Sequence, residues 1–397
     1  MPEARRVLRA AAVTAAVLTA FAAGVTLGAF QGGDSAASRT DADDPSHGIL
    51  DEAVDRIAAE AAYPVDPERL RRAAIEAMLA QTRDRWAAFY SPQDHDELRA
   101  LLAGHYGGLG LWLRRTADGK VRVVGVAPGS PAARGGVRAA DELLTVAGRP
   151  TAGRDVAEVV TDLRGAAGTP VLLELRTGAA PARQVRLVRA EVPVEDVSAR
   201  WLRPGVALVR VSAFTRGVAG QLRAALARFR AQRADGVVLD LRGDPGGLLD
   251  EAVEAAGAFL DGGPVVSYSG RATPPRTLSA PRHGDTTTPL VVLVDGGTAS
   301  AAEVLAGALQ DRGRAVVVGS RTFGKGSVQE AFPLPEGSAV ELTVASYRTP
   351  RGRSLDGVGL VPDVTVPPSA GEAVGLSRAR DVVVGLATAA RHGTSAG

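Results

Sequence analysis

Two residues in the last third of the chain, Ser300 and Lys325, have the types and the spacing that nucleophilic catalysis needs. Ser300 follows an apolar run at 290–294 and turn residues at 295–297, and an Ala- and Leu-rich segment begins directly after it. This pattern predicts a serine at the junction between a strand and a helix. The first N–H groups of a helix have no partner inside it, so the junction suits a nucleophile whose oxyanion is held by backbone N–H groups.

A serine nucleophile needs a base, and Lys325 is a better candidate than any of the five histidines because it stands in an ordered, glycine-flanked motif. Gln329 follows four positions later and can orient an amine without adding charge. A lysine base must be neutral near pH 7, so its pKa must fall from about 10.4 to roughly 7 or 8, at a cost of about 4 kcal/mol. No acid adjoins Lys325 in the sequence, so burial is the expected cause of this shift.

Both residues also allow plainer interpretations. A serine in front of a helix is most often only an N-cap, and a lysine in a glycine turn is most often solvated. The glycines around Lys325 come close to a phosphate-binding loop, but Gly326 stands where that motif needs Ser or Thr. We therefore do not expect a nucleotide site.

Three stretches taken together resemble the C-terminal processing (tail-specific) serine proteases of peptidase family S41. They are TASAAE at 298–303, TFGKGSVQ at 322–329 and LDLRGDPGGLL at 239–249, and the spacings between the key residues are also similar to those of the family. The resemblance covers roughly residues 50–366. It implies that Ser300 is the nucleophile, Lys325 the general base and Gln329 the residue that holds the lysine.

The glycine-rich turn that follows a predicted buried strand at 236–241 resembles another part of the family's site. Ligands of α/β sheets bind at the carboxyl ends of strands. The resemblance implies an oxyanion hole made of N–H groups from Gly246, Gly247 and Ala301. The family's usual asparagine is replaced by Asp244, whose negative charge near an oxyanion would be unfavourable unless it points away.

Short strands separated by turns are predicted within residues 104–190, with a helix at 156–163. This region resembles a PDZ domain, most specifically at 129–150. A PDZ domain binds an extended peptide as an added strand and captures its terminal carboxylate on loop N–H groups. The resemblance implies a peptide-binding segment in which Leu109 and Leu111 face the side-chain pocket. Its residues are Tyr106, Gly107, Gly108, Leu109, Gly110 and Leu111.

The amino terminus predicts a membrane segment. Residues 1–9 carry three arginines, and residues 10–30 carry no charge. At about 1.5 Å per residue this run spans roughly 31 Å, enough for the hydrocarbon core of a bilayer. We favour an uncleaved anchor, with a cleaved signal peptide as the alternative because much of the run is alanine. The basic start then places the rest of the chain outside the cytoplasm, in a single-pass membrane protein or, after cleavage, a secreted one.

The remaining regions differ in texture. Residues 31–46 have the composition of a flexible tether, and 47–103 show helical periodicity. In 191–366, strands alternate with helices, which favours an α/β fold, and the resemblance implies a ClpP/crotonase-like protease core. Residues 367–397 are predicted to be a tail with an amphipathic stretch at 378–390.

Two local patterns give more specific expectations. Trp86, Phe89 and Tyr90 are expected to end a helix and to pack on a neighbouring element. Residues 267–289, rich in Pro, Thr, Arg and Gly, are expected to form a surface loop.

Composition excludes several kinds of site. The chain has no cysteine, which rules out disulfides, thiolate metal sites and a cysteine nucleophile. Its net charge is only +2, and the arginines are interleaved with acids, so nucleic acid is not an expected partner. The proposed chemistry requires no metal and no cofactor.

The combined prediction is a membrane-tethered, extracytoplasmic serine endopeptidase. It binds C-terminal tails of polypeptides through its PDZ domain and cleaves peptide bonds with a Ser/Lys dyad through an acyl-enzyme; a homo-oligomer is left open. One alternative is a binding module without turnover, suggested by Asp244 and by Ala139, where the usual turn has proline. The other is an acyl-CoA enzyme, because the core is related in fold to the crotonase group, although the PDZ-like region and the export segment argue against it.

Overall fold

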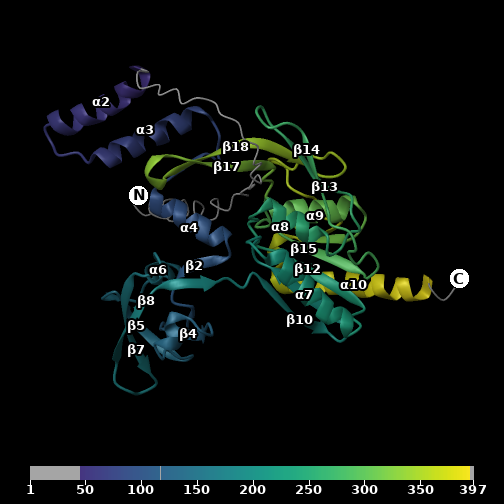
Figure 1. Ribbon diagram of the computed structural model, residues 1–397. Coiled ribbons are helices and arrows are strands. Elements are labelled where there is room, and N and C mark those ends of the chain that lie inside the picture. The colour runs from purple at the N-terminus through teal and green to yellow at the C-terminus, as the bar shows by residue number, and fades with distance from the viewer. Residues whose placement is uncertain (1–44, 117, 394–397) are drawn as a thin grey trace, which may run out of the picture.

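The computed structural model describes residues 45–116 and 118–393 (Figure 1). The predicted membrane segment at 10–30 and nearly all of the predicted tether lie outside the described residues. Within the described part of the chain, no helix is both long enough and apolar enough to cross a bilayer.

A six-stranded sheet forms the centre of the α/β core. Its neighbours pair in parallel except for the first strand, which runs antiparallel to the second. The two central strands are buried along their whole length, as expected when helices cover both faces of a parallel sheet. In spatial order the strands are β10 (Val197–Arg203), β11 (Val206–Val211), β12 (Gly236–Asp240), β15 (Leu290–Val294), β16 (Val316–Gly319) and β19 (Val364–Thr365).

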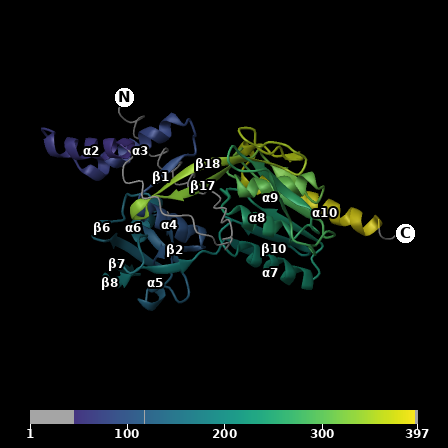
Figure 2. The ribbon, with the colours of Figure 1, turned by 45° about the horizontal axis from the view of Figure 1, so that its top comes forward.

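Helices α7 (Val218–Ala231), α8 (Leu249–Ala256) and α9 (Ala301–Asp311) pack on one face of this sheet, and α10 (Glu372–Gly393) packs on the other (Figure 2). This arrangement confirms the predicted α/β core. It differs from the prediction at the carboxyl end, where the helix is longer than the amphipathic stretch expected at 378–390. Because Ala379 and Val383 are fully buried under the sheet, α10 is a layer of the core.

A second sheet lies above the core in Figure 1, and the loop that carries the lysine candidate enters one of its strands. Two local expectations were wrong here. Ala88–Tyr90 is a strand that pairs with β18, so these aromatic residues do not end a helix, and the expected loop at 267–289 contains β14, which pairs with β13. For β1, pairing with a distant strand overrides the local pattern, whereas β14 pairs with the strand directly before it in the chain. The strands are β1 (Ala88–Tyr90), β13 (Pro264–Ser269), β14 (Arg276–Ser279), β17 (Ser327–Pro333) and β18 (Ala339–Arg348).

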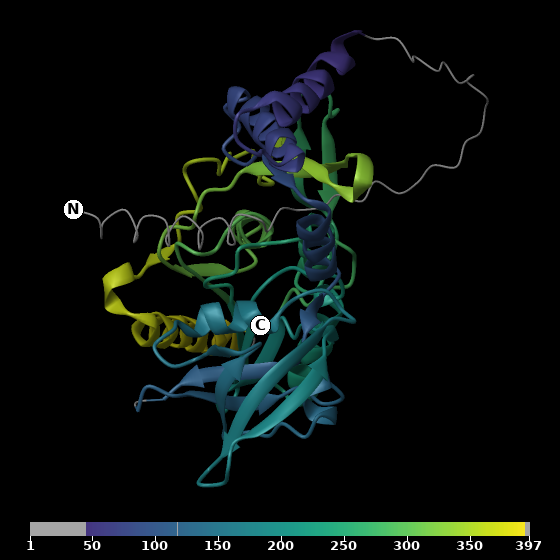
Figure 3. The ribbon, with the colours of Figure 1, turned by 90° about the vertical axis from the view of Figure 1, so that its left-hand side faces the viewer.

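Three helices precede and follow β1, as the periodicity of residues 47–103 predicts. They are α2 (Pro45–Glu60), α3 (Pro67–Gln81) and α4 (Pro92–Leu102). Asp66 and Ser91 are N-caps, each followed by a proline at the first helical position, which explains why α3 and α4 begin where they do. Figure 3 shows α2 and α3 at one end of the molecule, and α3 has no buried residue.

The β-rich unit at the other end of Figure 3 has its own apolar core around Leu109, Leu143 and Leu173. A short pair of strands, β2 (His105–Gly108) and β9 (Ala190–Pro193), joins its two ends, and the predicted helix is present as α6 (Val156–Leu163). The sheet contains β3 (Leu111–Arg115), β4 (Val121–Val126), β5 (Asp141–Val146), β7 (Pro170–Thr177) and β8 (Arg183–Val188), with β6 (Arg149–Pro150) paired to β5; a short helix, α5 (Pro131–Arg134), follows β4.

Candidate active site

Ser300 lies at the predicted junction, after β15 and directly before the first residue of α9. Its backbone has φ 52° and ψ −119°, a conformation that a non-glycine residue rarely adopts. The residue is only 2% exposed. Strain of this kind persists only where surrounding contacts impose it, and it is typical of functional sites.

The glycine-rich turn after β12 contacts the Ser300 turn. Ala299 N–H donates to Asp244 O at 2.9 Å, and Thr298 Oγ1 donates to Leu241 O at 2.8 Å. A Cβ atom added to Gly246 would lie 2.9 Å from Ser300 Cβ and 2.9 Å from the Ala301 backbone nitrogen. The two turns therefore meet at the carboxyl ends of neighbouring parallel strands, where the α/β fold places ligands.

The three predicted oxyanion donors differ in their hydrogen bonding. Gly246 N–H donates to Asp244 Oδ1 at 2.8 Å, so it already has an acceptor. Within the described residues, the N–H groups of Gly247 and Ala301 have no acceptor. This pair of donors, one from each turn, is suited to hold an oxyanion formed at Ser300.

Lys325 is buried, with 3% of its surface exposed, on the loop that enters β17. Its Nζ lies 4.6 Å from the centre of the Trp86 ring. Burial lowers the pKa of the amine, and the negative charges of Glu341 and Asp84 act in the opposite direction. The sequence places no acid beside Lys325. The fold brings Glu341 of β18 and Asp84 of the loop before β1 close to it.

Gln329 is buried on β17. Its Nε2 donates to Ser327 Oγ at 2.7 Å and to Thr343 Oγ1 at 3.2 Å, whereas its Oε1 is buried without a hydrogen-bond partner. In the part of the chain that the structure describes, no hydrogen bond joins the Ser300 hydroxyl, the Lys325 amine and the Gln329 amide. Gln329 therefore lies on the strand that follows the Lys325 loop, and its Oε1 is a free acceptor.

Glu303 was missed as a candidate, although it links the serine turn to the lysine loop. Its fully buried carboxylate accepts the N–H groups of Ser300, Gly324 and Lys325, each at 2.9 Å, and the Thr322 hydroxyl. Burial raises the pKa of Glu303, and these four hydrogen bonds act in the opposite direction. The Ser-x-x-Glu spacing, typical of a capping box, is the sequence signal that could have revealed it.

Two further contacts hold the lysine loop. The buried hydroxyl of Tyr347 on β18 donates to the Ser300 carbonyl at 3.2 Å and to the Lys325 carbonyl. The Asp84 carboxylate accepts two hydrogen bonds from Thr343, one from its N–H at 2.8 Å and one from its hydroxyl at 3.0 Å. These bonds fix the segment that carries Trp86. Trp86, expected to be only a packing residue, thus lies against the candidate base.

The predicted peptide-binding residues lie together on β2, on the turn after it and at the start of β3. Leu109 is 1% exposed inside the apolar core of this unit, and Leu111 packs against that core; their role in a side-chain pocket stays a prediction. The Tyr106 ring covers Gly108, because a Cβ added there would come within 2.6 Å of it. Gly107 pairs with β9, and Gly110 has φ 74°, which favours glycine.

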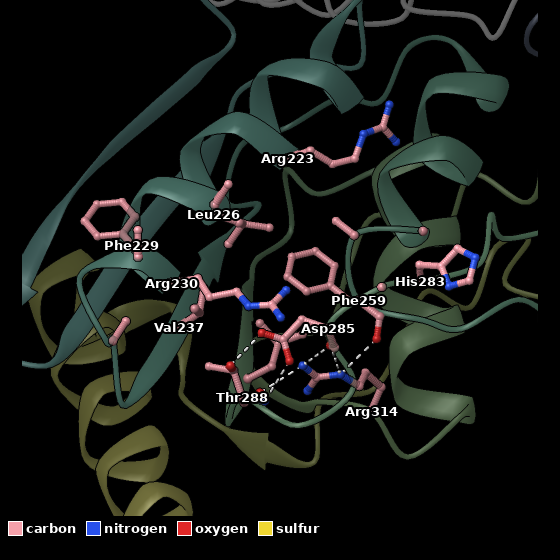
Figure 4. A pocket seen from close by; sticks show the side chains of 17 residues that line it. Arg223, Leu226, Phe229, Arg230, Val237, Phe259, His283, Asp285, Thr288 and Arg314 are labelled. Atoms are coloured by element: carbon pink, nitrogen blue, oxygen red, sulfur yellow. Dashed lines mark hydrogen bonds between the residues drawn. The ribbon is translucent and has the colours of Figure 1, made fainter.

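A cavity of about 530 Å³ between α7 and the segment 283–290 contains none of the candidate residues (Figure 4). Arg230 and Asp285 approach each other across it, and the Arg314 guanidinium is bound by backbone carbonyls, including that of Thr288 at 2.8 Å. Within residues 45–116 and 118–393, no group of three or more His, Asp or Glu side chains is arranged to hold a metal ion.

Gly246→Ala is expected to lower activity by about 100-fold, because the added Cβ would push against Ser300 and displace it. Gly243→Ala is the matched control in the same turn. It also imposes a side chain at positive φ, but its Cβ meets only Arg210, 4.0 Å away, so it should cost about 1–2 kcal/mol of stability with activity retained. Activity assays and thermal unfolding of both variants check this, and equal activity losses would contradict it.

Comparisons with known proteins identify the family of this chain. Residues 205–366 match peptidase family S41, and residues 122–177 match the PDZ domain. The chain is 36% identical over 308 residues to the carboxy-terminal-processing protease of Bartonella bacilliformis, covering 76% of this chain and 70% of the relative. It is 35% identical over 299 residues to the carboxyl-terminal-processing protease of Synechocystis sp., covering 74% and 70%.

Among solved structures, the photosystem II D1 C-terminal processing protease is similar to this one, with a TM-score of 0.50 and 32% sequence identity. The match covers 85% of this chain and 97% of that protein. The α/β core, the β-rich unit and the three sequence motifs thus have one explanation. The chain belongs to the carboxy-terminal-processing proteases of peptidase family S41, serine-type peptidases, and it carries a PDZ domain.

Proposed function

We propose that this protein is a membrane-tethered, extracytoplasmic endopeptidase that cleaves polypeptides captured by their C-terminal tails, with Ser300 as nucleophile and Lys325 as general base. One observation carries the proposal. Ser300 lies in a strained turn against the glycine turn of β12, with the unpaired N–H groups of Gly247 and Ala301 beside it. This is the arrangement that acyl transfer through a serine requires.

In the proposed mechanism, the neutral Lys325 amine takes the proton of Ser300 Oγ as that oxygen attacks the peptide carbonyl carbon. The N–H groups of Gly247 and Ala301 hold the resulting oxyanion. The C–N bond then breaks, and Lys325 returns the proton to the leaving amine, which leaves an acyl-enzyme on Ser300. Water, deprotonated by Lys325, hydrolyses the ester and restores the serine.

The amine must leave the face of Trp86 for this to happen, because its contact with the ring favours the charged form. The buried Oε1 of Gln329 is the open acceptor that supports a second position of the amine. We propose that Lys325 moves between these two places and that Gln329 holds it while it acts on Ser300.

A pair of peptides tests capture of the tail. A peptide with an apolar carboxyl-terminal sequence should be cleaved, and the same peptide with a terminal amide should show a kcat/KM at least about tenfold lower, since loop N–H groups favour a carboxylate. Mass spectrometry of the products gives the cleavage sites. Equal rates for the two peptides would contradict tail capture, and binding without any cleavage would favour the binding-module alternative.

Activity is expected to rise with pH through the titration of Lys325. The base acts only as a neutral amine, and burial lowers its pKa from the ordinary value. The kcat/KM should therefore increase about tenfold per pH unit as the pH rises toward this pKa. A profile that is flat or falls between pH 6 and 8 would count against Lys325 as the base.

Membrane tethering rests on the charge pattern of residues 1–30. We expect the full chain to fractionate with membranes and to remain there in alkaline carbonate, and a chain lacking residues 1–30 to be released. Protease digestion of intact cells and spheroplasts tests on which side of the membrane the chain lies. Recovery of the full chain from the cytoplasm would contradict both parts of the proposal.

Self-association is proposed through α2 and α3. These helices expose Ile49, Leu50, Ile57 and Met78, and the segment between them exposes Tyr63, each by about half or more of its surface. An exposed apolar patch on two neighbouring helices is suited to pack against a second copy of the chain. Light scattering of the chain with and without residues 45–81 tests this. The same number of chains per particle in both proteins would refute it.

A further inference from the structure

Asp244 is a buried acid that the mechanism above does not use. It follows β12 and lies two residues before Gly246, and none of its surface is exposed. Its Oδ1 accepts the Gly246 N–H at 2.8 Å, and its Oδ2 is buried without any hydrogen-bond partner. Half of this carboxyl group is therefore unsatisfied.

Within the described residues, no cation forms an ion pair or a hydrogen bond with Asp244. Arg210 of β11, whose positive charge acts on Asp244, donates to the Arg242 carbonyl at 3.1 Å and lies 3.8 Å from Asp240, with no hydrogen bond to Asp244. The other charged neighbour is Asp196, a buried acid before β10 whose oxygens accept hydroxyl groups of Ser212 and Thr215.

Protonation is the way to stabilise a buried carboxyl group with few donors that costs the least free energy. An ionised carboxylate removed from water needs a cation or several donors, and Asp244 has one N–H. Burial raises the pKa of Asp244 well above its ordinary value, and the negative charge of Asp196 adds to this shift, while the Gly246 N–H and Arg210 act against it. The neutral form is therefore the one expected near pH 7.

We propose that Asp244 is a positioning residue that supports catalysis only while its carboxyl group is protonated. In that form it holds the Gly246 N–H, and so holds the glycine turn against Ser300, without adding charge. Loss of the proton to solvent would place a negative charge beside the oxyanion that forms at Ser300 and raise the barrier to its formation. The inference rests on the proposed role of Ser300 as nucleophile.

Asp244→Asn tests this, because an amide copies the shape of the neutral acid and cannot ionise. We expect the variant to keep kcat/KM at pH 7 within about threefold of the wild type. The wild type should lose activity about tenfold per pH unit above the pKa of Asp244, and the variant should not. Asp261→Asn, at an exposed acid, is the matched control and should keep the alkaline fall.

Stability gives a second measurement that does not need turnover. A carboxyl whose pKa is raised on folding holds its proton in the folded state and loses it in the unfolded state above about pH 4. We therefore compare the folding equilibrium constant of the wild type with that of Asp244→Asn. Their ratio should fall about tenfold per pH unit between about pH 4 and the pKa of Asp244 in the folded protein.

The outcomes are distinguishable. A stability difference that does not change with pH would show that Asp244 is ionised in the folded protein and overturn the proposal. An alkaline fall shared by wild type and Asp244→Asn, or absent from the wild type up to pH 10, would overturn its role in the reaction. Failure of the proposed nucleophile shows separately, as activity retained in Ser300→Ala.

Discussion

Ser300→Ala is expected to lower kcat/KM for a tail-bearing peptide by roughly 10⁴-fold or more, while peptide binding and stability stay near those of the wild type. Without the hydroxyl no acyl-enzyme forms, and only the contributions of binding and of the N–H groups of Gly247 and Ala301 remain. Alanine fits the site, because the Ser300 contacts in the described residues are made by its backbone. Peptidase assays with purified protein measure the loss.

Lys325→Ala should lead to the same low rate, and the double variant should be no slower than either single variant. Residues that act as one unit in a reaction have strongly non-additive effects, since removing one already abolishes the step that both serve. Losses that multiply in the double variant would mean that the two side chains act independently, which the proposed dyad does not allow.

The chain provides matched controls for both substitutions. Ser346→Ala changes an exposed serine of β18, and Lys120→Ala changes the other lysine of the chain, a partly exposed residue that pairs with Asp118. Both should keep wild-type activity. Wild-type activity in Ser300→Ala would refute the assignment of the nucleophile.

The surroundings of Ser300 were predictable from the sequence because they are determined locally. The apolar run of β15, the turn residues after it and the Ala-rich start of α9 lie within about twenty residues, and each has a known structural preference. The same holds for β12 and its glycine turn. The resemblance to a known family then supplied the roles, which local patterns cannot do.

The surroundings of Lys325 were not predictable in this way. Trp86 and Asp84 come from a loop more than 200 residues earlier in the chain, and Glu341 comes from β18. Their approach depends on β1 pairing with β18, a long-range contact that no periodicity in 86–90 reveals. The absence of an acid beside Lys325 in the sequence was therefore a poor guide to its electrostatic environment.

Glu303→Ala is expected to have the largest effect on stability in the site, a loss of about 3 kcal/mol or more. The substitution leaves three buried N–H donors, those of Ser300, Gly324 and Lys325, without an acceptor, and each costs about 1–3 kcal/mol. It also releases the lysine loop from the serine turn. A displacement of about 1 Å between reacting groups can cost about 100-fold in rate, so activity should fall at least that far.

Glu303→Gln separates the two roles of this carboxylate should the alanine variant fail to fold. The amide has one acceptor oxygen, which can serve Ser300 and Lys325 if its NH₂ group turns toward Thr322. The Gly324 N–H then loses its acceptor, and the Thr322 hydroxyl accepts from the amide instead of donating to the carboxylate. The expected loss of stability is then about 1–3 kcal/mol, with the rate reduced less than in the alanine variant. Glu330→Gln, on the neighbouring strand β17, should change neither property. If Glu303→Gln kept full stability and rate, the carboxylate would not be what holds the lysine loop to the serine turn, and Tyr347, which donates to the carbonyls of both Ser300 and Lys325, would be the next residue to replace.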